Sequence, residues 1–170
     1  MDVTARDRVD LTIDEERELA RRIGTAWKEL RRGAAMSILR DHLFGAGKDA
    51  LEPGQVDTLD LLAREPAWRM SDLADALRVD PSTATRAVQR LERSGLAERR
   101  PSPDDGRVVI VSATALGLQR HSAIDERRRV SMSTLLSAFD LDERQELADL
   151  MDRLVASLDG FAEGLLPEHD

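Results

Sequence analysis

Apolar residues recur every three or four positions in the first quarter of the chain, and this spacing predicts a long amphipathic helix within residues 11–50. Thr12 and Glu15 have the spacing of a capping box, which predicts that the helix begins beside Thr12. Residues 1–10 are polar and without such a period, as is typical of a frayed tail. The apolar stripe of the helix consists of Leu19, Ile23, Ala26, Trp27, Leu30, Ala34 and Ile38.

Three shorter helices are predicted between residues 51 and 95. Pro53 suits the first turn of the first helix, and Ser71 is a suitable N-cap for the second. In the third helix Asp80 suits the N-cap, Pro81 the first helical position, and Gly95 the left-handed residue after the helix end. The positions expected to face a core are Val56, Leu59, Leu62, Leu73, Ala74, Leu77, Ala84, Val88 and Leu91.

The period changes after residue 95. The strand-like runs LAERR and VVIVS lie on either side of the turn-rich segment PSPDDG, and this arrangement predicts a β-hairpin. A helical period resumes at Thr114 and continues toward the C-terminus with one break near the segment FDLDE. The predicted order is a long helix, three short helices, a hairpin and two helices, which gives a mainly α fold of the α+β class.

This order of elements predicts a winged helix-turn-helix over residues 51–117. The flanking helical regions, residues 11–50 and 118–170, carry more apolar surface than a winged domain alone would cover. We therefore expect these two regions to form the dimerisation region of a homodimer, in which they cover each other.

Composition removes several classes of site. The chain has no cysteine, which excludes disulfides, thiolate metal sites and cysteine nucleophiles. The N-terminus lacks an apolar signal core, and no run approaches the roughly 18 apolar residues of a membrane span, so a cytoplasmic protein is expected. No His-x-x-x-His pair, phosphate-binding loop or nucleophile elbow occurs, so we predict no metal site, no cofactor and no enzymatic activity.

Positive charge is concentrated in one part of an acidic chain. The formal net charge is −8, yet residues 81–107 hold six arginines against four carboxylates. If Ala84 and Val88 face the core, then a helix turning about 100° per residue places Arg86 and Arg93 on the opposite side. Arginine can bond guanine in the major groove, glutamine can bond adenine, and hydroxyls can bond phosphates or base edges. The exposed face and its flanks contain Ser82, Thr83, Thr85, Arg86, Gln89, Arg90 and Arg93.

A solvated helix surface has the same residue types, and for a single helix that ordinary interpretation is preferable. The neighbouring elements instead favour a recognition helix that enters the major groove. A short helix before it, the tight connection RVDPS and a hairpin after it are typical of such a helix. Arg99 and Arg100, on the first strand of the hairpin, are expected either near phosphates or in solvent. A winged helix that contacts an acidic protein partner remains the alternative from another functional class.

The segment MSDLADALRVDPSTATRAVQRLERSGLAERRPSPDDGRVVIVSATALG resembles the DNA-binding core of the MarR family of bacterial transcriptional regulators. The matching motifs are LADAL, TR and RLERSGL, followed by a wing that contains Asp105, Arg107, Thr114 and Gly117. The resemblance is close over residues 51–120, and the flanking helices agree with the family by layout alone.

The resemblance implies a homodimer that binds a pseudopalindromic operator in double-stranded DNA, as a repressor more readily than as an activator. It also implies that Arg107 reaches the minor groove and that Asp105 helps to position it. A narrow minor groove has a concentrated negative potential, which is consistent with that role. Gly106 departs from the family, in which many members have an arginine, and this predicts a weaker grip on the minor groove.

Members of this family often respond to a small molecule bound beside the dimerisation helices, so the resemblance also implies an effector. An anionic or phenolic effector would suit Arg31. Trp27 and His42 also have ordinary interpretations, as a core residue and a surface residue. The candidate ligand-binding residues are Trp27, Arg31, Met36, His42 and Trp68.

Overall fold

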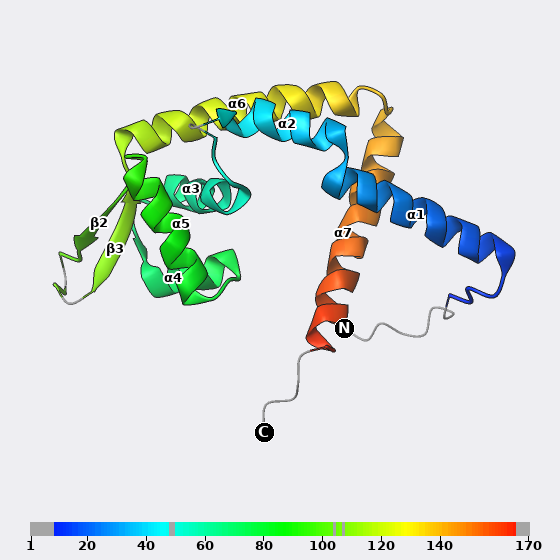
Figure 1. The fold of residues 1–170 in the computed structure, drawn as a ribbon, viewed down its shortest axis with the longest axis horizontal. Coiled ribbons are helices and arrows are strands. Elements are labelled where there is room, and N and C mark those ends of the chain that lie inside the picture. The colour runs from blue at the N-terminus through cyan, green and yellow to red at the C-terminus, as the bar shows by residue number, and fades with distance from the viewer. Residues whose placement is uncertain (1–8, 48–49, 104, 107, 166–170) are drawn as a thin grey trace. The chain divides into compact units, whose positions relative to one another are not determined.

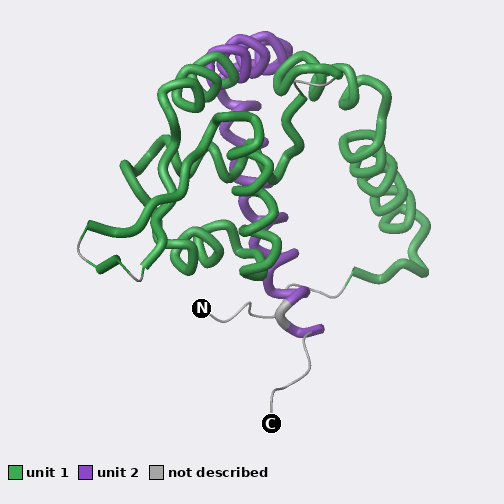
Figure 2. The backbone as a smooth tube through the Cα atoms, turned by 60° about the vertical axis from the view of Figure 1, so that its left-hand side comes forward, with its two compact units in different colours: residues 1–124 green, residues 125–170 purple. Residues whose placement is uncertain are grey.

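The computed structural model describes residues 9–47, 50–103, 105–106 and 108–165. The predicted tail, residues 1–10, lies almost entirely outside these residues. Two compact units can be distinguished, residues 1–124 and residues 125–170 (Figure 2). The first unit holds a winged helix-turn-helix, as the sequence predicted, and Figure 1 shows its hairpin beside the short helices.

The first helical region is two helices, α1 (Asp14–Arg32) and α2 (Ala34–Phe44), where the sequence predicted one. Gly33 separates them, because its backbone is extended at a residue type that forms helix poorly. The predicted capping box is also wrong, since Ile13 is the N-cap and Thr12 instead bonds the carboxylate of Asp10, at 2.9 Å from its amide and 2.7 Å from its hydroxyl. Neither helix contains a buried residue among those described.

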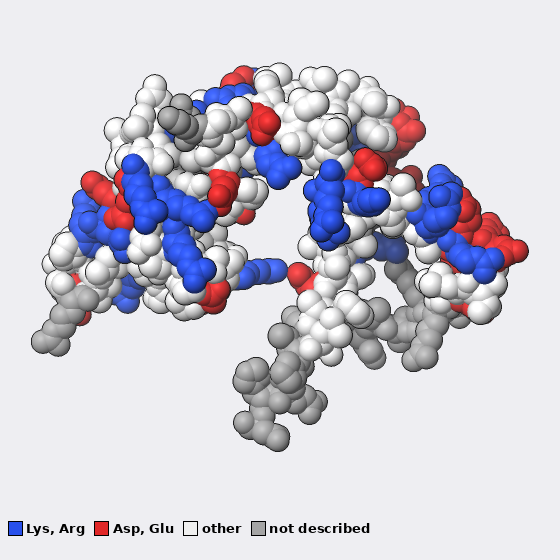
Figure 3. All heavy atoms as spheres, in the orientation of Figure 1, with Lys and Arg blue, Asp and Glu red and all other residues white. Residues whose placement is uncertain are grey.

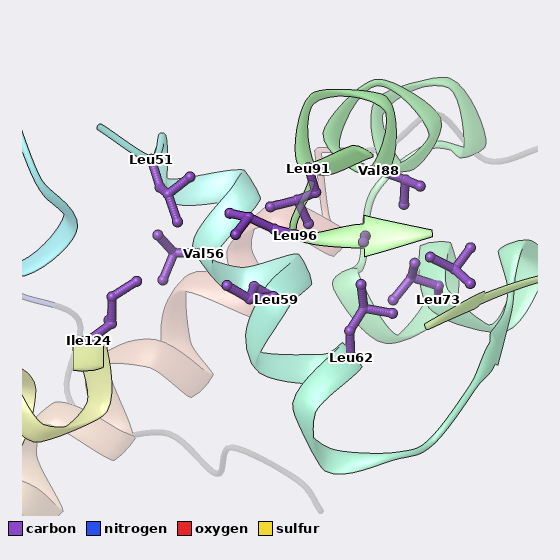
Figure 4. Close-up of a cluster of buried hydrophobic side chains, with 11 residues drawn as sticks. Leu51, Val56, Leu59, Leu62, Leu73, Val88, Leu91, Leu96 and Ile124 are labelled. Carbon is purple, nitrogen blue, oxygen red and sulfur yellow. The ribbon is translucent and has the colours of Figure 1, made fainter. Parts of the chain in front are cut away.

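Three helices form the base of the winged domain: α3 (Pro53–Arg64), α4 (Met70–Leu77) and α5 (Pro81–Arg93). Apolar side chains from all three converge on one core, in which Leu59, Leu73 and Leu91 are fully buried (Figure 4). The predicted inward positions are therefore confirmed, apart from Leu77, which is half-buried. Ser71 does not cap α4, because the N-cap is Arg69 and the Ser71 hydroxyl bonds Asp72 at 2.9 Å.

The wing belongs to a three-stranded antiparallel sheet with the order β1-β3-β2. The predicted hairpin is confirmed as β2 (Ala97–Pro101) and β3 (Val109–Ala113). The third strand, β1 (Trp68–Arg69), was not predicted, because two residues are too few to show an alternation. Val111 pairs with Trp68 on one side and with Arg99 on the other, so β3 joins the wing to the segment that precedes α4.

The helix α6 (Ala115–Leu136) begins directly after the sheet and runs from the first unit into the second. Thr114 fixes its start, since the hydroxyl donates to the Gly95 carbonyl at 2.6 Å and accepts the Gly117 amide at 3.0 Å. Further along, His121 Nε2 lies 3.2 Å from Asp60 Oδ1 on α3. These contacts hold the first turns of α6 against the winged domain.

The second unit contains the end of α6 and α7 (Leu141–Glu163). The break predicted near FDLDE is confirmed, and Asp140 and Glu143 form a capping box with two hydrogen bonds of 2.9 Å. No described residue of this unit is buried within the single chain. None of the helices in the described part of the chain is long and apolar enough to cross a membrane.

Candidate nucleic-acid interface

The first turn of α5 is organised by Asp80, as the sequence predicted. Its carboxylate accepts the Thr83 amide at 3.0 Å and the hydroxyls of Ser82 and Thr83. The hydroxyl of Ser82, and after it the hydroxyl and amide of Thr83, hold the pKa of Asp80 well below its ordinary value. Pro81 at the first position and Gly95 at a φ of 70° mark the two ends of the helix as expected.

Replacing Asp80 with alanine is expected to lower the Tm by about 2–4 °C, because the first turn of α5 loses its cap. Since the folded carboxyl has a lowered pKa, its stabilising effect is complete above the ordinary value of 3.8 and is lost as the pH falls below it. Thermal unfolding at pH 7 and pH 3 measures both effects. The Asp80→Asn variant is the control, because asparagine caps helices equally well; a Tm as low as that of the alanine variant would contradict this role.

The opposite sides of α5 have opposite chemistry. Ala84, Val88 and Leu91 are fully buried against α3 and α4. Arg86 and Arg93 are exposed on the other side, and neither makes a hydrogen bond or ion pair with another described residue. Figure 3 shows Lys and Arg side chains gathered over α5. The helix therefore presents two guanidinium groups to solvent, and Gln89 lies half-buried between them.

Each flank of this exposed face carries an ion pair. On one flank, the guanidinium of Arg90 pairs with the carboxylate of Glu52, which directly precedes α3. On the other flank, Arg99 on β2 bonds both oxygens of Glu92 at 3.0 Å and 2.6 Å. The hydrogen bond with Glu92 raises the pKa of Arg99. Two of the predicted DNA-binding arginines are thus paired within the protein.

Glu52 and Glu92 were not predicted from the sequence to be part of this site. Glu52 and Arg90 are 38 positions apart, and no periodic pattern relates them. Glu92 lies seven positions before Arg99, a spacing that has no meaning across a helix end and a strand start. The excess of arginine over carboxylate in this segment could not show which arginines are paired.

The hydroxyl groups of α5 donate within the helix. Ser82 and Thr83 donate to Asp80, and the Thr85 hydroxyl donates to the Pro81 carbonyl at 2.7 Å. A phosphate oxygen accepts hydrogen bonds and cannot donate them, so each hydroxyl must rotate before it can bond a phosphate. Arg86 and Arg93 are therefore the arginines of α5 that can bind an anion without first breaking a contact with a described residue.

The wing is described in part. The side chain of Arg100 on β2 is exposed and makes no hydrogen bond or ion pair with a described residue. Asp105, near the tip, is also exposed and takes part in an interaction. Arg107, the residue predicted to enter the minor groove, lies outside the described residues.

The candidate ligand-binding residues fall on separate elements. Trp27 and Arg31 lie on α1, where the Trp27 side chain is 42% exposed. Met36 is half-buried and His42 exposed on α2. Trp68 is half-buried on β1, and its indole N–H donates to the Leu61 carbonyl at 3.0 Å. Trp68 therefore packs against the core of the winged domain.

A shallow concavity on α1 contains none of these five residues. It is lined by Leu19, Arg21, Arg22, Ile23, Thr25 and Ala26. Within the described ranges, no group of three or more His, Asp or Glu side chains could hold a metal ion.

The chain is similar in sequence to a known protein family and to known bacterial proteins. The model of the MarR family matches residues 51–109, from just before α3 to the first residue of β3. An uncharacterized HTH-type transcriptional regulator of Mycobacterium bovis is 30% identical over 126 residues, which is 74% of this chain and 88% of that protein.

Solved structures share the fold. The PcaV transcriptional regulator of Streptomyces coelicolor, in complex with its natural ligand, has a TM-score of 0.60 and 25% identity, and the match covers 90% of this chain and 99% of PcaV. FabT of Streptococcus pneumoniae, in complex with DNA, has a TM-score of 0.67 and 23% identity, over 86% of this chain and 99% of FabT. At that identity the likeness to FabT shows the fold alone.

Proposed function

Because the chain belongs to the MarR family of DNA-binding transcriptional regulators, we propose that it is a homodimeric repressor that binds a pseudopalindromic operator. Its family and its relatives are regulators and not enzymes. The observation that carries the proposal is the outer face of α5, where Arg86 and Arg93 are exposed and make no ion pair with a described residue.

In this proposal α5 is the recognition helix and enters the major groove. Arg86 lies in the middle of the exposed face, where its guanidinium group can bond O6 and N7 of a guanine together. Gln89 is one turn further along and can bond N6 and N7 of an adenine. Arg93 lies near the C-terminal end of the same face, where a phosphate contact is the simpler assignment.

The wing supplies the second proposed contact with DNA. Arg107 enters the minor groove, and Asp105 positions it, as the resemblance of the wing to that of the family implies. Arg100 supports this assignment, because its exposed side chain makes no ion pair with a described residue and lies on the strand leading to the wing tip. A contact from Arg100 to the phosphate backbone adds affinity for DNA of any sequence.

The homodimer is supported by apolar surface that the single chain leaves exposed. On α1, Ile23 is 62% exposed and Leu30 58% exposed. On α7, Val155 is 54% exposed and Phe161 is 67% exposed. A monomer rarely exposes so many large apolar side chains, and such surfaces mark sites of association. A dimer would place two recognition helices on half-sites about one turn of DNA apart.

The proposed regulator also binds a small-molecule effector. PcaV shows that a related regulator binds a natural ligand. On this chain Trp27, Arg31, Met36 and His42 combine aromatic, apolar and cationic chemistry on α1 and α2, which would suit an anionic or phenolic molecule. Trp68 is the weakest member of this set, because its indole N–H is already bonded within the winged domain.

The test is binding of the purified full-length protein to a fluorescent duplex from upstream of its own gene, in competition with a scrambled duplex and over a series of salt concentrations. Specific binding that weakens steeply as salt rises is the expected result, since phosphate contacts release counterions. If that duplex shows no specific binding, selection from random duplexes identifies an operator elsewhere. A selection that enriches no sequence would contradict the proposal and favour a winged helix that contacts protein.

A further inference from the structure

The two ion pairs that flank the exposed face of α5 differ in exposure. In the pair between Glu92 and Arg99, the side chains are 26% and 33% exposed, and both carboxylate oxygens are bonded. In the pair between Glu52 and Arg90, they are 66% and 47% exposed, and the bonded atoms are Oε2 and one guanidinium nitrogen. The pair with Glu52 is therefore the more accessible to water and to a competing anion.

A carboxylate and a phosphate bind an arginine in the same manner, through charge-assisted hydrogen bonds to the guanidinium group. Exposed ion pairs contribute little to stability, because water and salt screen them. A duplex that approaches the exposed face of α5 can thus displace Glu52 from Arg90, which lies on the flank of that face. Arg99, held by both oxygens of a less exposed carboxylate, is the harder arginine to release.

We propose that Glu52 is a built-in counter-charge for Arg90, which DNA must displace and which thereby lowers the affinity of the recognition helix for any duplex. The inference rests on the proposed role of α5 in DNA binding. It assigns to Glu52, which directly precedes α3 and lies outside the recognition helix α5, a part in setting how strongly the protein binds DNA regardless of sequence.

The counter-charge on Glu52 also affects how DNA binding depends on salt concentration. When Arg90 takes a phosphate, cations leave the DNA, but the Glu52 carboxylate set free can attract a cation in return. The net release of ions at this contact is therefore reduced. Without the carboxylate, the slope of log affinity against log salt concentration should steepen by up to about one unit, the contribution of a single phosphate contact.

The experiment compares the Glu52→Gln variant with wild type on a random-sequence duplex over a series of salt concentrations. Glutamine keeps the shape of the side chain and removes its charge. Affinity at low salt should rise about two- to five-fold, as expected when an exposed ion pair no longer competes. Glu98→Gln is the matched control, because Glu98 is an exposed carboxylate on β2 that makes no ion pair with a described residue. It changes the net charge equally and should raise affinity less.

A second pair of variants tests whether the gain depends on Arg90. Adding Arg90→Gln to Glu52→Gln should abolish the gain, so that the double variant binds as weakly as Arg90→Gln alone. If Glu52→Gln behaves like Glu98→Gln, or if its gain persists without Arg90, this inference is overturned and the proposed function stands. If the wild-type protein binds no duplex in a salt-dependent manner, the proposed function and this inference both fail.

Discussion

Replacing Gly117 with alanine is expected to destabilise the winged domain by about 3 kcal/mol or more, the upper range for a forced steric overlap. A Cβ atom on Gly117 would lie 2.0 Å from the carbonyl oxygen of Leu96 and 3.0 Å from its carbonyl carbon. Both are backbone atoms of the turn between α5 and β2, so no side-chain rotation can relieve the overlap. Either the first turn of α6 moves away, or the turn before β2 does.

The expected change in the free energy of unfolding is opposite in sign to the change that helix propensity predicts. Gly117 lies inside α6, where alanine would ordinarily stabilise a helix by about 0.5–1 kcal/mol. Gly24 provides the matched control, because it also lies inside a helix, α1, and a Cβ atom there would meet nothing within 4 Å. Urea unfolding should show Gly24→Ala unchanged or stabilised and Gly117→Ala strongly destabilised. Equal free energies of unfolding for these two variants would disprove the close approach of α6 to the turn between α5 and β2.

This contact gives a physical reason for one of the motifs that carried the family resemblance. Thr114 and Gly117 were notable only as a spacing in the sequence. In the structure the Thr114 hydroxyl joins the turn after α5 to the start of α6, and Gly117 allows α6 to lie against the Leu96 carbonyl. The two residues therefore fix where α6 leaves the winged domain.

Local signals predicted local structure well. Both ends of α5 were predicted correctly from Asp80, Pro81 and Gly95, because capping and left-handed turns depend on a few neighbouring residues. The hairpin was equally clear, since two strand-like runs enclosed a turn. The positions of Leu59, Val88 and Leu91 in the core followed from helical periodicity.

Features that depend on distant residues were not predictable from these signals. The strand β1 exists because Trp68 and Arg69 pair with Val111 and Ile110, more than forty positions away.

The apolar stripe continues through Gly33, so periodicity alone did not reveal the break between α1 and α2. The partner of Arg90 was missed for a related reason, because Glu52 reaches it from the start of another helix.

The second large effect concerns Arg86, whose replacement by alanine is expected to reduce discrimination between operator and random DNA by about 1–3 kcal/mol, or roughly 5- to 150-fold. Arg86 lies opposite the buried face of α5, and no described residue competes for its guanidinium group. It can therefore bond two acceptors of one guanine without first breaking a contact. The measurement is the ratio of affinities for the selected operator and for a random duplex.

Salt dependence distinguishes a base contact from a phosphate contact. If Arg86 reads a base, the alanine variant should lose operator affinity at every salt concentration, with little change in the salt slope or in binding to random DNA. If Arg93 contacts a phosphate, Arg93→Ala should weaken binding to both duplexes equally and reduce the slope by about one unit. Arg22→Ala is the control, because it removes the same charge from the exposed surface of α1, outside the proposed DNA interface. It should change neither the affinity for the operator nor the salt slope. An Arg86→Ala variant that matches this control would show that α5 does not read the operator through Arg86, and recognition would then depend on Gln89 or on the wing.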